Sequence, residues 1–214
     1  DEFLTQIEQQ IGNSLEYSEE LVDFLCMLQE IKHQCGKYDE ALDCSEKVLG
    51  ITLKALGPEH PSLESIYRNQ GLTYNEKGEY DKAIDCHEKA LELVLISYGA
   101  EHTGVATCYH NLGMAHKLKG QSEKAIEYYE MALAINLKVF GPDDSANGTT
   151  FNNLGAVYRQ KGDYKKGIEY YNKALDIAKK IHGSKHPVIA ISYNSLGLAY
   201  FDKREYEKAF SFLK

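Results

Sequence analysis

The chain contains no tryptophan and only four prolines among its 214 residues. No apolar run reaches the ~18–20 residues that a membrane-spanning helix needs, and no signal peptide opens the sequence. With 32 acidic against 24 basic residues, the net charge of −8 argues against non-specific binding to nucleic acid or to anionic lipid. We therefore expect a cytoplasmic protein without nucleic-acid or membrane partners. Because the chain begins at Asp1 rather than methionine, we also expect it to be part of a longer protein.

Motifs for disulfide, metal or catalytic chemistry are also missing. The five cysteines are odd in number and include no Cys-x-x-Cys pair, so we expect small core residues in a reducing compartment rather than disulfides or a zinc site. The sequence has no Gly-x-Ser-x-Gly elbow, phosphate loop, dinucleotide fingerprint or His-Glu-x-x-His motif. We expect no catalytic residue, no metal site and no cofactor, and so a protein that is not an enzyme.

A short segment recurs every 42 residues along the chain. Its five copies begin at Gly36, Gly78, Gly120, Gly162 and Arg204. An aromatic-x-x-Leu-Gly-x-x-Tyr pattern lies upstream of the recurring segment, and small residues recur downstream of it. The upstream pattern appears as Tyr109, Leu112, Gly113 and His116, and again as Phe151, Leu154, Gly155 and Tyr158. Spacings of three and four place these residues on one face of a helix, and the small residues allow a second helix to pack closely against it.

The pattern resembles the tetratricopeptide repeat over nearly the whole chain. The common form has 34 residues, and the period of 42 here resembles the longer repeat of the kinesin light chain type. The resemblance implies an all-α fold, a right-handed superhelical solenoid of antiparallel helix pairs with about five repeats. The expected boundaries are 1–14 for the end of a preceding repeat, then repeats at 15–57, 58–99, 100–141, 142–183 and 184–214, the last truncated in its second helix.

The repeat register predicts the helices. First helices are expected at 18–34, 62–77, 104–119, 146–161 and 188–203, and second helices at 38–55, 80–97, 122–139, 164–181 and 205–214. Residues 2–11 are expected to form an additional helix. The chain ends with Phe210, Phe212 and Leu213 and no polar capping repeat, which favours self-association through that end.

Three histidines occupy one register position, in the turns between repeats. His60, His102 and His186 lie one repeat apart, too far to share one metal ion, so we interpret them as turn and helix-start residues. Cys44 and Cys86 occupy the position of Tyr128 and Tyr170, which indicates a packing role.

In the family that the chain resembles, the first helices line a groove that binds peptides. Carried over to this sequence, the groove residues are Arg68, Asn69, Asn75, His110, Asn111, Lys117, Asn152, Asn153, Arg159 and Asn194. Carboxamides such as Asn69, Asn111 and Asn153 could bond the peptide backbone of an extended ligand. Alternatively, they could bond neighbouring helices. The lining is neutral to basic, which favours a ligand with acidic and apolar residues, although lysine and arginine on a solvated face would give the same pattern.

Two functions are therefore open. The first is a scaffold or adaptor module that binds a peptide segment of a partner protein in its groove. The second is a structural, regulatory or self-associating segment of a larger multidomain signalling protein or enzyme. RNA binding is disfavoured by the net charge and by registered aromatics, such as Tyr67 and Phe151, that are expected in the core.

Overall fold

The computed structural model describes residues 19–212, and their side chains from residue 22 onward. The chain divides into two compact units, Asp1–Tyr98 and Gly99–Lys214, each described here by itself. Within the described range the secondary structure is helical, with no strand. The additional helix expected at residues 2–11, and Leu213, lie outside the described residues.

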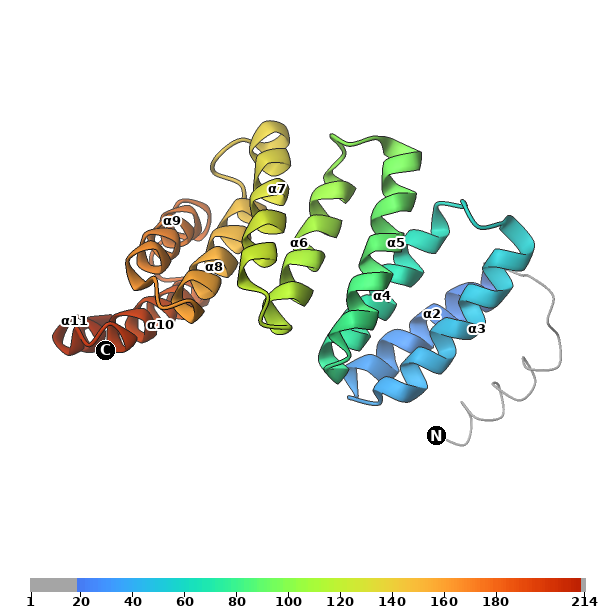
Figure 1. Ribbon diagram of the computed structural model, residues 1–214, viewed down its shortest axis with the longest axis horizontal. Helices are drawn as coiled ribbons and strands as arrows, with labels where there is room; N and C mark the ends of the chain where they lie inside the picture. The colour runs from blue at the N-terminus through green and yellow to red at the C-terminus, as the bar shows by residue number, and fades with distance from the viewer. Residues whose placement is uncertain (1–18, 213–214) are drawn as a thin grey trace. The chain divides into compact units, whose positions relative to one another are not determined.

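Each unit is built from antiparallel helix pairs (Figure 1). The first unit contains α2 (Glu19–Gln34), α3 (Tyr38–Leu56), α4 (Ser62–Lys77) and α5 (Tyr80–Tyr98). The second unit contains α6 (Thr103–Leu118), α7 (Ser122–Phe140), α8 (Ser145–Gln160), α9 (Tyr164–His182), α10 (Pro187–Asp202) and α11 (Tyr206–Phe212). From α2 to α10 every boundary lies within one residue of its expected position. The first helix of each pair has 16 residues, and second helices α3, α5, α7 and α9 have 19.

Both ends of the first helices are set by residues that recur in the repeat. Gly78 has a φ of +81°, a left-handed conformation that ends α4, and Arg204 holds the equivalent position with a φ of +66°. At the other end, the Nδ1 atoms of His102 and His186 accept hydrogen bonds from the backbone N–H groups of Gly104 and Val188. The helix-start role expected for these histidines is confirmed.

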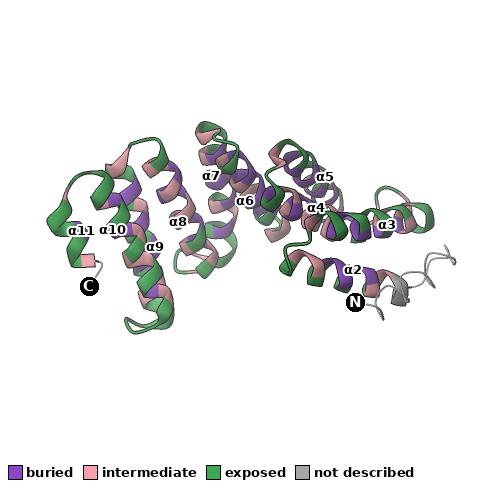
Figure 2. Cartoon of the chain, turned by 90° about the horizontal axis from the view of Figure 1, so that it is seen from below, coloured by how far each residue is buried: buried purple, intermediate pink, exposed green. Residues whose placement is uncertain are grey.

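Close packing within a pair depends on a glycine in the first helix facing a ring from the second. A Cβ atom on Gly113 would lie 2.8 Å from the ring of Tyr129, and Gly155 has the same relation to Tyr171. Both tyrosines are buried, and buried residues line the facing sides of the helices (Figure 2). Pairs then stack, because α7 packs on α8 and α9 on α10, while α6 contacts α8 and α8 contacts α10. The first helices α6, α8 and α10 therefore form one layer of the second unit.

The cysteine and aromatic expectations need correction. Cys44, Cys86 and Cys108 are buried, but Cys26 is half-buried and Cys35 is exposed because it follows the last residue of α2. The registered aromatics Tyr67 and Phe151 are only half-buried, because one edge packs on the core while lysine side chains lie over their rings. No described helix is long and apolar enough to cross a membrane.

The carboxyl-terminal end is only partly open. The ring of Phe212 stacks on Tyr200 with a centroid separation of 5.5 Å and also contacts Tyr193. Phe210, in contrast, is 66% exposed. Of the described pair, Phe210 is therefore the residue that could support association through this end.

Candidate functional site

Three predicted groove residues of the second unit form a hydrogen-bonded network across α6 and α8. The Nζ of Lys117 donates to the Oδ1 of Asn153 at 3.3 Å. The Nδ2 of Asn153 lies 3.2 Å from the Nε2 of His110. Asn153 therefore uses both ends of its carboxamide on neighbouring side chains, which is the alternative that the sequence left open for the asparagines.

The network fixes the proton positions of His110. Because Oδ1 of Asn153 accepts from Lys117, its Nδ2 must donate to Nε2 of His110, which places the imidazole hydrogen on Nδ1. Burial lowers the pKa of His110, and the nearby charge of Lys117 lowers it further. Burial also lowers the pKa of Lys117. The site therefore presents a neutral imidazole beside an ammonium group. The imidazole ring packs edge-on against Tyr129, and its Nδ1–H has no hydrogen-bond acceptor among the described residues.

The other two cations expected in the groove already have acidic partners. Arg159 pairs with Asp202 at 2.8 Å, and Arg68 in the first unit pairs with Glu64 at 3.1 Å. Lys117 has no carboxylate partner among the described residues, and its single hydrogen bond goes to Asn153. The positive character of the predicted groove is therefore concentrated at Lys117.

The remaining predicted residues differ in accessibility. Asn75 and Asn111 are buried, with 4% and 8% of their surface exposed. Asn75 turns toward His87, and its Nδ2 lies 3.5 Å from Nε2 of that ring. Asn69 and Asn152 are half-buried, and Asn194 is exposed. The structure thus brings His110, Lys117 and Asn153 together and directs Asn75 into the helix pair.

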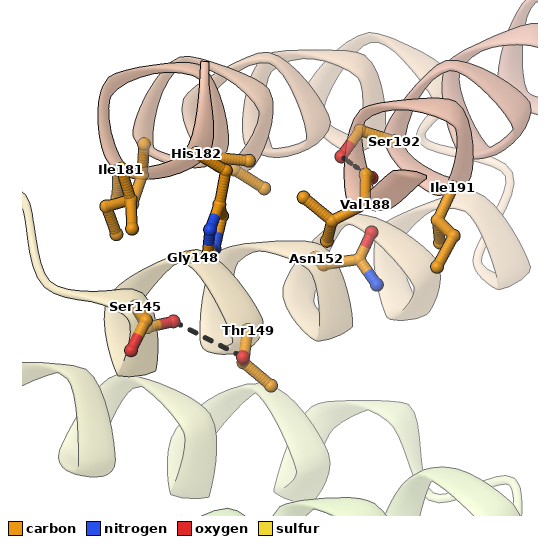
Figure 3. A pocket seen from close by; sticks show the side chains of 12 residues that line it. Ser145, Gly148, Thr149, Asn152, Ile181, His182, Val188, Ile191 and Ser192 are labelled. Atoms are coloured by element: carbon orange, nitrogen blue, oxygen red, sulfur yellow. Dashed lines mark hydrogen bonds between the residues drawn. The ribbon is translucent and has the colours of Figure 1, made fainter. Parts of the chain in front are cut away.

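Two hollows flank α8 in the second unit. The α6–α8 pocket, of about 430 Å³, is lined by residues that include His110, Asn136, Phe140 and Thr149. The α8–α10 pocket, of about 200 Å³, is shown in Figure 3, where Ile181 and His182 come from α9 and Asn152 from α8. Asn136 and the isoleucines were not identified as site residues from the sequence. Only the first-helix positions that line the groove in the family were considered there, and these residues lie at other positions. The 42-residue period could have found them, since every lining position of the first pocket recurs in the second.

The described residues contain no cluster of three His, Cys, Asp or Glu side chains that could hold a metal ion. Residues 147–149 read Asn-Gly-Thr, which matches the acceptor sequence for N-glycosylation. Asn147 is fully buried in α8, and its Nδ2 donates to the Gly141 carbonyl at 2.7 Å.

Comparison with protein families matches the tetratricopeptide repeat at residues 30–94, 62–138 and 147–214. The chain belongs to the tetratricopeptide repeat family. Its fold is an all-α tetratricopeptide solenoid, which the solved repeats of a putative kinesin light chain share. Proteins with this repeat are in general scaffolds for protein–protein interaction.

Solved structures show the same fold. BtubC (BKLC) from P. vanneervenii is 25% identical, with a TM-score of 0.77 over 90% of this chain and 76% of that one. A putative kinesin light chain of Podosopora anserina with nearly identical repeats is 24% identical, with a TM-score of 0.78 over 92% and 94% of the two chains. The apo form of RapI is 16% identical, with a TM-score of 0.74 over 89% and 67%. A comparison with curated proteins finds no match.

Proposed function

We propose that this chain is a non-enzymatic scaffold or adaptor module whose second unit binds an acidic peptide segment of a partner protein along α6, α8 and α10. The observation that carries the proposal is Lys117, a half-buried ammonium group without a carboxylate partner in the described part of the chain. A buried charge is stabilised by an opposite charge at hydrogen-bond distance. A ligand carboxylate would supply that charge, whereas Arg159 already has Asp202.

The distribution of charge supports the same unit as the binding site. Residues 99–214 contain 16 basic and 12 acidic residues, whereas residues 1–98 contain 8 basic and 20 acidic residues. An acidic peptide is therefore attracted by the second unit and repelled by the first. Arg68 and Asn69 in the first unit stay predicted contacts. The five cysteines are thiols rather than disulfides, which supports the reducing, cytoplasmic setting that is part of the proposal.

Selection from a displayed library of short random peptides tests this function. The full chain should enrich acidic peptides, and the best peptide should bind more weakly as salt is added, because exposed charges are screened. Lys117→Met, which keeps the length of the side chain, should weaken binding about tenfold or more, since a hydrogen bond to a charged group contributes about 1.5–3 kcal/mol. The matched control is Lys165→Met, at an exposed lysine of α9. No enrichment, or equal losses in both variants, would contradict the proposal.

Self-association is the second candidate, and Phe210 is the observation that favours it. This ring is 66% exposed on the last described helix, where a further repeat or a second copy could cover it. Sedimentation velocity over a range of concentrations should then show a dimer that Phe210→Ser abolishes. A monomer at every concentration rejects this candidate and leaves peptide binding unaffected.

A further inference from the structure

The two pockets beside α8 are copies of one feature with different chemistry. Thr103, Asn136 and Phe140 of the α6–α8 pocket are replaced, 42 residues later, by Ser145, Ala178 and His182 of the α8–α10 pocket. The shared residue Thr149 lines both, so the two hollows adjoin. A ligand that runs across α6, α8 and α10 therefore meets the same backbone geometry twice, with two different linings.

The α6–α8 pocket contains polar groups that lack a partner. Asn136 is only 7% exposed, yet no described group bonds its carboxamide. His110 lines the same pocket, and its Nδ1–H is also unused by the described residues. Both side chains therefore keep hydrogen-bonding capacity that a bound group can use. These two side chains offer N–H donors, close to the network that holds the Lys117 charge, which is a donor set suited to a carboxylate.

The α8–α10 pocket is lined mainly by aliphatic side chains. Figure 3 shows Ile181, Val188 and Ile191 around it. Ile191 is 62% exposed, and in the preceding repeat its position is held by Thr149. An exposed isoleucine on the rim of an apolar hollow gains stability when an apolar side chain covers it.

We propose that the two pockets are the side-chain subsites of one extended segment of a partner protein, an inference that rests on the proposed function. The α6–α8 pocket takes an Asp or Glu side chain, with the Nδ1–H of His110 and the Nδ2 of Asn136 as donors. The α8–α10 pocket takes a large aliphatic side chain. Packed helices lie about 8–10 Å apart. A segment in the polyproline II conformation advances about 3.1 Å per residue and places every third side chain on the same face. The acidic and aliphatic residues are therefore about three positions apart.

The test starts from the best peptide selected on the full chain. Asn136→Asp changes a carboxamide to a carboxylate of the same shape, so it should weaken an acidic peptide at least tenfold. Asn136→Asp should leave almost unchanged the affinity for a peptide that has Gln or Asn in place of the acidic residue. Ala134→Asp is the control, because it adds the same charge at an exposed position of α7 outside the pocket.

The second subsite is tested with Ile191→Ser and its control Ile96→Ser, at an isoleucine of α5 that is 57% exposed. Ile191→Ser should lower the affinity for the selected peptide at least fivefold. The variant should bind as well as the unchanged protein when the aliphatic residue of the peptide is replaced by alanine. Inserting one residue between the two anchors should cost as much as losing one of them. Failure of the library to enrich any peptide overturns the proposed function and this inference together. Selected peptides that are indifferent to Asn136→Asp and Ile191→Ser overturn the subsites alone.

Discussion

His87 should make the first unit sensitive to acid. The ring lies in α5 with 1% of its surface exposed, packed against Gly71 of α4. Its Nδ1 atom has no hydrogen-bond partner, and its Nε2 atom has only the 3.5 Å contact with Nδ2 of Asn75. Burial lowers the pKa of His87 from 6.5 to about 4, with a smaller contribution from the charge of Arg68. Protonation would place a charged ring in a site that is almost closed to water and has no carboxylate partner for it among the described residues.

The sign and size of the effect follow from linkage. The unfolded chain binds the proton more readily than the folded chain does, so His87 costs no stability above about pH 6.5, and stability falls as the pH falls toward about 4. The pKa of His87 falls from 6.5 in the unfolded chain to about 4 in the folded chain. This difference corresponds to a loss of about 3 kcal/mol in the free energy of unfolding once the pH is below both values. At about pH 5 the loss is about 2 kcal/mol, a large fraction of the stability of a small domain.

Urea unfolding at about pH 7.5 and about pH 5, followed by circular dichroism, measures this loss. His87→Tyr installs the residue that packs on glycine in the next two repeats, and it should remove about 2 kcal/mol of the pH dependence. His182→Gln, at an exposed histidine, is the control and should lose as much stability as the unchanged protein. The reasoning is refuted if His87→Tyr folds and still loses as much stability at about pH 5 as the unchanged protein. An NMR titration that places the ring of His87 near pKa 6.5 would refute it as well.

Two further predictions concern backbone positions of the repeat, both measured by urea unfolding at neutral pH. Arg204→Gly should stabilise the second unit by about 1 kcal/mol, because Arg204 holds a φ of +66° where the other repeats have glycine, and replacing it with alanine should bring no such gain. Gly113→Ala should destabilise by about 1–3 kcal/mol, because the added methyl group meets the buried ring of Tyr129. The same change at Gly50, which faces open space inside α3, should instead stabilise by about 0.5–1 kcal/mol, and equal effects at the two glycines would contradict this account.

The repeat register was enough to predict the helices, but it did not predict which hydrogen bonds and ion pairs the site residues form. The helix ends depend on local residues, such as Gly78 and His102, whose equivalents recur in other repeats. The positions of the helix ends could therefore be predicted to within one residue. The bonds of Asn153 join residues that are 36 and 43 positions away. Such contacts depend on how α6 and α8 pack, and no local pattern reports that packing. The same holds for Arg159, whose charge is balanced by Asp202 in the next repeat.

A single register position accounts for much of the difference between repeats. It is occupied by Asn75, Lys117 and Arg159 in three successive repeats. Asn75 turns inward because its neighbour on the second helix is His87, whose nitrogen can accept from a carboxamide. The later repeats have a buried tyrosine there, which packs on glycine and provides no ring nitrogen, so Lys117 bonds Asn153 instead. The residue at this register position therefore has a different partner in each of the three repeats, namely His87, Asn153 and Asp202.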